Sequence, residues 1–138
     1  MNQERIKKSD EYWKSKLTKK EFNILRKKST ELPFSGKYLN NKEKGVYLCA
    51  GCGNKLFSSE TKYNSGTGWP SFSDAMSHKI KTKQDNSLLM RRKEVLCNRC
   101  GGHLGHVFKD GPKPTGLRFC VNSASLNFKK QKSKKSNI

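Results

Sequence analysis

The sequence predicts a mainly β fold, in which a small antiparallel sheet structure follows a short N-terminal helical segment. Three observations support this class. Short apolar runs alternate with glycine-rich turns from about residue 33 onward, a helix-capping pattern precedes them, and only 32% of the 138 residues are hydrophobic, which limits the core. A chain of this length is most often one domain, and we expect that domain to cover residues 1–128.

The helical segment is expected over about residues 10–28. Thr18, followed three residues later by Glu21, is a capping box, in which each side chain bonds the backbone N–H of the other residue. Apolar residues then recur at helical spacing, which predicts a short helix over about 19–28. The proline- and glycine-containing stretch at 32–36 ends the helix and turns the chain.

The β core is expected over about residues 33–128, with short strands joined by turns. The strand-like runs are residues 45–48, 55–57, 87–90, 94–96, 106–108 and 117–121. Residues 129–138 hold five lysines and no acidic residue, so we expect a disordered basic tail.

The net charge of +19 is concentrated at the two ends of the chain. One interpretation is nonspecific contact with nucleic acid or acidic partners. The other, which we favour, is a lysine-rich composition, because lysine outnumbers arginine and suits a solvated surface better than base recognition. The sequence contains no apolar run that would span a membrane and no secretory signal, which predicts a cytoplasmic protein.

Four of the five cysteines form two Cys-x-x-Cys-Gly units, and 44 residues separate Cys52 from Cys97. Cys49, Cys52, Cys97 and Cys100 therefore have the spacing of a four-thiolate structural zinc site. The glycine after each pair permits the turn that brings backbone N–H groups towards the thiolates. Two alternatives remain open: one pair is a redox pair, or His103 replaces one cysteine as a ligand.

The fifth cysteine lies in the strand-like run 117–121. Because side chains alternate along a strand, Arg118, Cys120 and Asn122 share one face, opposite the apolar residues between them. A nearby cation lowers the pKa of a thiol, and an amide can hold a substrate oxygen, so the pattern suits a nucleophile. The alternative is a buried, inert cysteine.

Two further segments carry groups that suit a catalytic cysteine. His103 and His106 follow the second cysteine pair, and histidine is the usual acid–base partner of a thiol. On a regular strand these two residues would face opposite ways, so Gly105 would have to break the alternation. Trp69 stands on a glycine-rich loop, where a rigid aromatic face can line an apolar pocket. Each also has a structural interpretation: satisfied buried histidines, and a core tryptophan.

Together these segments resemble the B-type methionine sulfoxide reductases, which reduce the R epimer of methionine sulfoxide. The resemblance spans about residues 33–128. It rests on Ser65–Phe72, Gly102–Phe108, Asp110–Pro112, Pro114–Leu126 and both cysteine pairs.

The resemblance implies a fold of two antiparallel sheets with a zinc ion away from the catalytic centre. It implies that Cys120 attacks the sulfoxide sulfur and that His103, His106 and Asn122 activate its oxygen, with His106 as the proton donor. Trp69 corresponds to the residue that packs on the substrate methyl group.

The same resemblance assigns Arg118 and Asp110 to supporting positions, with Arg118 assisting the thiolate. The products it implies are methionine and a sulfenic acid on Cys120. The substrates would be oxidised proteins or peptides that contain methionine-R-sulfoxide.

Thr67 departs from the pattern of many family members, which have a resolving cysteine at this position. With four thiols assigned to zinc, no second free thiol remains in the chain. We therefore expect an external thiol reductant, thioredoxin or a glutathione-type donor, to reduce the Cys120 sulfenic acid directly. We also expect the protein to be a monomer.

Two other functions compete with this hypothesis. A non-enzymatic zinc-ribbon module that binds nucleic acid would use the cysteine pairs and the basic charge, but it leaves the Cys120 and Trp69 segments unexplained. A zinc-dependent hydrolase needs an open metal position, and four cysteines close it.

Overall fold

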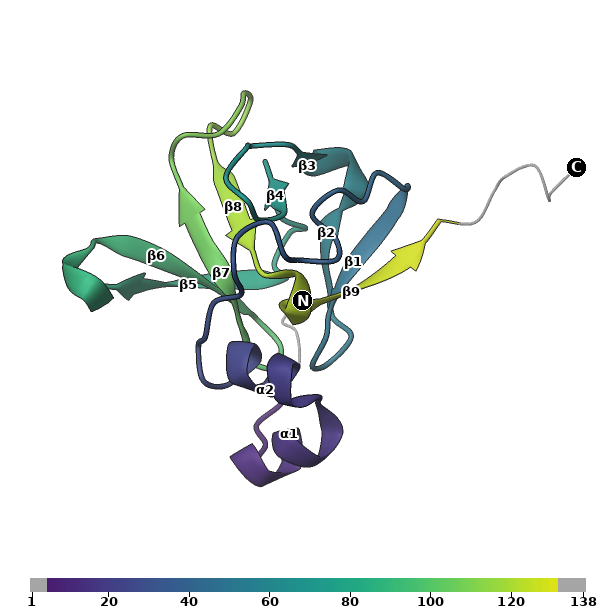
Figure 1. The fold of residues 1–138 in the computed structure, drawn as a ribbon, viewed down its shortest axis with the longest axis vertical. Helices are drawn as coiled ribbons and strands as arrows, with labels where there is room; N and C mark the ends of the chain where they lie inside the picture. The colour runs from purple at the N-terminus through teal and green to yellow at the C-terminus, as the bar shows by residue number, and fades with distance from the viewer. Residues whose placement is uncertain (1–4, 132–138) are drawn as a thin grey trace, which may run out of the picture.

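Two antiparallel sheets and two short helices make up the computed structural model, which describes residues 5–131 (Figure 1). The smaller sheet has the order β2-β1-β9, and the larger has the order β3-β4-β8-β7-β6-β5. The predicted fold class is thus confirmed. The smaller sheet consists of β1 (Gly45–Cys49), β2 (Lys55–Ser58) and β9 (Leu126–Lys130). The larger consists of β3 (Lys62–Tyr63), β4 (Ser71–Phe72), β5 (Ile80–Asp85), β6 (Arg92–Cys97), β7 (His103–Phe108) and β8 (Arg118–Val121).

The N-terminal lead forms α1 (Asp10–Lys16) and α2 (Lys19–Leu25), which lie below the sheets in Figure 1. The predicted capping box is present: Glu21 N donates to Thr18 Oγ1 at 3.1 Å, and Thr18 N donates to the Glu21 carboxylate at 2.9 Å. Helix α2 ends three residues earlier than predicted. Shortly beyond it, Lys28 adopts a left-handed conformation (φ 64°), which helical propagation does not allow.

The core joins the two sheets and the helices, and aromatic rings form its centre. Phe57 stacks on Phe72 with ring centroids 4.4 Å apart, and Tyr47 packs edge-on against Phe72 at 5.1 Å. All three side chains are fully buried. Aromatic pairs in these geometries add about 0.5–1.5 kcal/mol each beyond the burial of their area, so a few rings support a core drawn from a polar sequence.

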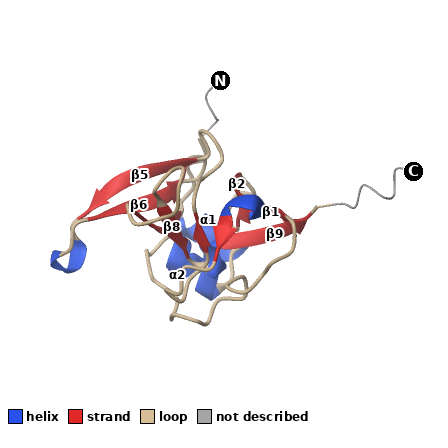
Figure 2. Cartoon of the chain, turned by 90° about the horizontal axis from the view of Figure 1, so that it is seen from above, coloured by secondary structure: helices blue, strands red, loops and turns tan. Residues whose placement is uncertain are grey.

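The hairpin of β5 and β6 projects from the side of the molecule (Figures 1 and 2). The prediction of a strand over 87–90 is wrong, because β5 and β6 pair from Ile80↔Cys97 to Asp85↔Arg92 and the residues between must form the turn. Part of that turn is a 3-10 helix, Ser87–Leu89. The sequence did not reveal β5 because this edge strand is mostly polar, as exposed edges commonly are.

Strand β8 passes into β9 through a second 3-10 turn, Ser123–Ser125, so the chain changes sheets directly after Asn122. Strand β9 continues to Lys130, two residues past the predicted end of the core. The remainder of the predicted disordered tail, 132–138, lies outside the described residues. Within the described residues, no helix is long and apolar enough to cross a membrane.

Candidate functional site: a thiol pocket and a four-thiolate centre

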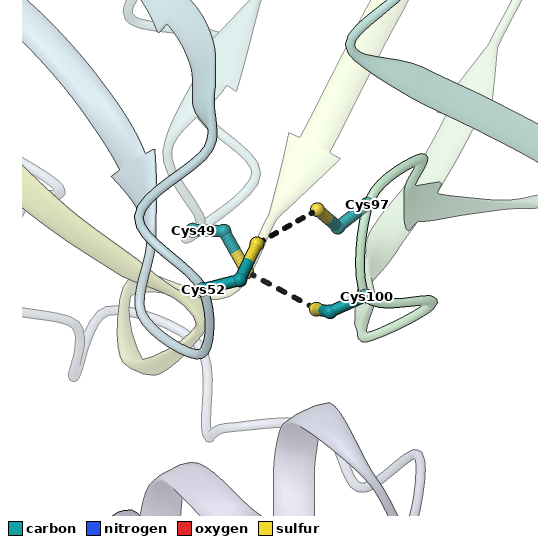
Figure 3. A group of neighbouring side chains, drawn as sticks. All are labelled: Cys49, Cys52, Cys97 and Cys100. Atoms are coloured by element: carbon teal, nitrogen blue, oxygen red, sulfur yellow. Dashed lines mark hydrogen bonds between the residues drawn. The ribbon is translucent and has the colours of Figure 1, made fainter. Parts of the chain in front are cut away.

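The four paired cysteines come from two loops that face each other (Figure 3). Their sulfur atoms all lie within 4.8 Å of one another, with Cys49–Cys100 and Cys52–Cys97 at 3.6 Å. A tetrahedral zinc ion with Zn–S bonds of about 2.3 Å separates its sulfur atoms by about 3.8 Å. The donor set and its size therefore fit one structural zinc ion.

The local backbone explains how each pair reaches this geometry. Gly53 N donates to Cys49 O and Gly101 N donates to Cys97 O, both at 2.8 Å, and both glycines have φ near +80°. L-residues with a side chain rarely adopt that conformation, which accounts for a glycine after each pair. Three of the four cysteines are buried, and only Cys52 is partly exposed. His103 is not part of the group, which removes the alternative in which it replaces a cysteine.

Cys120 lines a separate pocket of about 250 Å³ on the face of the larger sheet. None of the four paired cysteines lines it. Five predicted site residues line this pocket together with Thr67: Trp69, His106, Arg118, Cys120 and Asn122. The structure therefore brings together most of the predicted site, while His103 lies behind the pocket wall and Asp110 supports it from outside.

The strand pairing explains why Cys120 and His106 meet. In the β7–β8 register His106 lies directly opposite Cys120. A bulge shifts the β6–β7 register between Val95, which pairs with Gly105, and Leu96, which pairs with His103. The break in alternation predicted at Gly105 thus falls on the preceding residue, Leu104, which has no partner on β6. The His103 and His106 rings lie 5.5 Å apart, edge to face.

Gly105 also tolerates no side chain. A Cβ atom at this position would overlap the backbone carbonyl of Cys120. Cys120 therefore holds its position in the pocket only because the backbones of β7 and β8 approach this closely at Gly105.

Arg118 contributes less to the thiol than expected. Its guanidinium makes two hydrogen bonds to Asp110, at 2.8 and 3.1 Å, which hold the pKa of that carboxyl below its usual value. Burial raises the pKa of the Cys120 thiol, and this outweighs the opposing effects of the Arg118 charge and the Thr67 hydroxyl. The expectation of a lowered Cys120 pKa is therefore wrong for the free protein, because desolvation dominates.

Each histidine bonds a buried carboxylate that sequence reasoning missed. His103 Nδ1 lies 2.7 Å from Glu94 Oε2, and His106 Nε2 lies 2.8 Å from Asp85 Oδ2. Both carboxylates are 4% exposed. Lys28 Nζ lies 3.3 Å from Glu94 and 3.5 Å from Asp85, which places one cation between the two acids.

Hydrogen bonding and burial shift the pKa values of Asp85 and His103. The hydrogen bond from His106 holds the pKa of Asp85 well below its usual value. Burial lowers the pKa of His103, against the opposing influence of Glu94. The Nε2 atom of His103 is buried and has no hydrogen-bond partner among the described residues, so it is left available to a further group. Glu94 directly precedes the apolar residues Val95 and Leu96 and follows three consecutive basic residues, and nothing in that sequence marks it as buried.

Residues 28–31, which we call the strap, cross the edge of the pocket and hold its other side chains. Glu31 N donates to Asn122 Oδ1 at 3.1 Å, and Glu31 O accepts from Trp69 Nε1 at 3.1 Å. The buried Glu31 carboxylate accepts from the backbone N–H groups of Ser123 and Ala124. Asn122 Nδ2 donates one hydrogen to Leu104 O and keeps a second. The strap therefore fixes both the amide and the indole of the pocket.

A model of the SelR domain matches residues 17–130 of the chain. The chain belongs to the SelR domain family. It is 58% identical over 132 residues to the peptide methionine sulfoxide reductase MsrB of Methanosarcina mazei, covering 95% of this chain and 94% of that one. It is 57% identical to the MsrB of Leptospira interrogans, covering 95% and 100% of the two chains.

A relative from rat has a name that specifies the stereochemistry. Methionine-R-sulfoxide reductase B2, mitochondrial, is 55% identical over 128 residues, which cover 87% of this chain and 74% of the rat protein. The pocket around Cys120 and the four-thiolate centre both lie within the part of the chain that the SelR model matches. The non-enzymatic zinc-ribbon alternative is not favoured.

Proposed function

We propose that this chain is a peptide-methionine (R)-S-oxide reductase that returns methionine-R-sulfoxide in oxidised proteins to methionine. The observation that carries the proposal is Cys120, the one thiol outside the four-thiolate group, in a pocket with Trp69 and His106. The family membership supports the reaction, and the pocket supports the residue roles.

In the proposed step, the Cys120 sulfur attacks the sulfoxide sulfur while the sulfoxide oxygen takes up a proton. The transient sulfur–sulfur bond and the sulfur–oxygen bond of the substrate then break as the hydroxyl passes to the Cys120 sulfur, so that methionine leaves as the thioether and Cys120 is oxidised to a sulfenic acid. His106 is our choice of proton donor, because it lies opposite Cys120 and lines the pocket. The second amide hydrogen of Asn122 is a further donor for the oxygen. His103, held by Glu94 and packed edge to face on the His106 ring, is proposed to assist by supporting that ring.

Trp69 is proposed to pack on the methyl group of the substrate, with its indole held by the strap. Arg118 and Asp110 are proposed to support the wall of the pocket, and the Arg118 charge to stabilise the thiolate once it forms. Burial of the free thiol fits a site in which a bound substrate completes the activation, since catalytic hydrogen bonds often tighten only in the complex.

An external dithiol, thioredoxin being our candidate, is proposed to regenerate Cys120. Two thiols reduce the sulfenic acid to a thiol and water and leave as a disulfide. Thr67, at the position of the resolving cysteine in many relatives, instead lines the pocket with Cys120, and its hydroxyl acts to lower the pKa of the thiol. A cytoplasmic location and a monomeric state complete the proposal, since five reduced cysteines suit a reducing compartment.

The test is a Cys120→Ser variant assayed on a peptide containing methionine-R-sulfoxide, with dithiothreitol as reductant. We expect turnover to be lost and zinc content to be unchanged. Retained turnover would remove Cys120 from the reaction. Mass spectrometry of the oxidised wild-type protein should show a sulfenic acid on Cys120, and a disulfide between Cys120 and another cysteine of the chain would contradict direct external regeneration.

A further inference from the structure

An exposed apolar turn lies at the edge of the proposed substrate pocket. Leu32 and Phe34 are 75% and 69% exposed, and the Pro33 between them is exposed as well. Three consecutive exposed apolar residues are unusual on a soluble protein unless they serve a contact. This run follows directly on the part of the strap that bonds Trp69 and Asn122.

The conformation of the turn is unfavourable for its sequence. Ser35 N donates to Leu32 O, with Pro33 and Phe34 at the two central positions and Phe34 at φ 64°. A positive φ at the second central position, after a proline at the first, normally selects glycine or asparagine. A phenylalanine there carries strain of about 1–2 kcal/mol, which a glycine or asparagine in the same conformation would largely avoid.

The turn is attached to the loop that carries Trp69. Phe34 N donates to Gly68 O at 2.7 Å, and Pro33 and the Phe34 ring lie against Gly68. On the other side of the strap is a depression of about 600 Å³ lined in part by Thr30, Glu31 and Leu32. Thr30 also lines the Cys120 pocket. A polypeptide leaving that pocket over Thr30 would thus pass Leu32, and Phe34 is exposed on the same turn two residues further along the chain.

We propose that Leu32 and Phe34 form the contact surface for the substrate polypeptide, and that it selects an apolar side chain next to the methionine sulfoxide. This inference rests on the proposed function, because it concerns the polypeptide of the same substrate. The occupant is an extended or unfolded segment, since the side chain must enter a pocket while its neighbours lie on the rim. A small sulfoxide fills the pocket but does not reach this surface.

The experiment compares two variants, Phe34→Asn and Leu32→Ser, with Leu89→Ser as the matched control. Leu89 is a fully exposed leucine on the β5–β6 turn, away from the pocket. The substrates are the R epimers of N-acetyl-methionine sulfoxide and of two short peptides, in which leucine or serine flanks the methionine sulfoxide. Each protein is assayed with dithiothreitol as the reductant and, in a parallel series, with thioredoxin.

We expect KM for the leucine-flanked peptide to rise about five- to tenfold in both test variants. KM for N-acetyl-methionine sulfoxide should stay within twofold of the wild type, and the control should not differ from it. Phe34→Asn should unfold at the same or higher denaturant concentration, because asparagine accepts the left-handed conformation. A loss of peptide affinity in that variant would therefore not be a loss of fold.

Three outcomes would overturn the inference: unchanged KM values, an equal rise for the peptide and the small sulfoxide, or a defect seen only when thioredoxin replaces dithiothreitol. The second would show that the turn merely supports the Trp69 loop, and the third that it binds the reductant. A wild-type protein that reduces none of the substrates would instead overturn the proposed function itself.

Discussion

Replacing Gly105 with alanine should separate the two strands that place Cys120 and His106 opposite each other. The new methyl group would overlap the Cys120 carbonyl and approach Val121 Cα within about 3.0 Å. All these contacts are with backbone, so no side-chain rotation relieves them. Strand β8 would have to move away from β7.

The cost of this movement follows from the contacts beside the overlap. Leu104 O accepts hydrogen bonds from Asn122 N at 3.0 Å and Asn122 Nδ2 at 3.1 Å, each contributing about 1 kcal/mol. Leu104 and Val121 are fully buried, and repacking such residues costs about 1–3 kcal/mol. We therefore expect Gly105→Ala to lower the free energy of unfolding by about 3–5 kcal/mol.

Urea denaturation of the wild type, Gly105→Ala and Gly116→Ala measures this difference. Gly116 has φ 72° with no atom near its would-be Cβ, so its replacement tests conformational strain alone, at about 1 kcal/mol. The sulfoxide reductase activity of Gly105→Ala should fall more than its stability predicts, because Cys120 itself moves. A Gly105→Ala protein as stable as Gly116→Ala would refute the role of the close strand approach.

Two further predictions concern the metal centre and the buried histidine. Removing zinc with a chelator, or replacing Cys97 with serine, should unfold the domain, as monitored by circular dichroism. The reason is that structural zinc contributes about 10–16 kcal/mol, against a typical domain stability of about 5–15 kcal/mol. An apo protein that kept its native spectrum would contradict this prediction. Burial lowers the pKa of His103, so the unfolded chain takes up that proton first as the pH falls below about 6.5, and stability should drop from there downward. A His103→Gln variant should lack that drop in stability between about pH 6.5 and 5. The stability lost through protonation of Asp85, whose folded pKa is lowered, is instead lost near pH 4 and below. A variant with the same dependence of stability on pH as the wild type would contradict the role of His103.

The parts of the site that the sequence predicted are those defined by spacing within a short segment. The cysteine pairs and the capping box at Thr18 follow from local geometry, and the structure confirms both. Cys120 and Trp69 were identified from their segments and meet in one pocket. Strand alternation also correctly predicted a break between His103 and His106, although it falls at Leu104 rather than at Gly105.

What the sequence could not supply depends on contacts between distant segments. Lys28 meets Asp85 and Glu94 only because α2 ends early and the strap crosses the sheet. The pKa of Cys120 depends on how much of the chain covers it, and desolvation is not visible in a strand pattern. Strand β5 was missed because its polar residues gain their order from pairing with β6 rather than from a buried face.

Because Cys52 is partly exposed, the protein is itself open to the oxidation whose damage it would repair. Oxidants reach thiols according to their exposure and thiolate character, and zinc ligands are thiolates. Three of the four are shielded by the fold, so Cys52 is the member of the group that a dissolved oxidant meets first. Loss of that ligand removes one of the four metal bonds that hold the two cysteine loops together. In a protein built in this way, the most accessible structural sulfur atom takes no part in the repair.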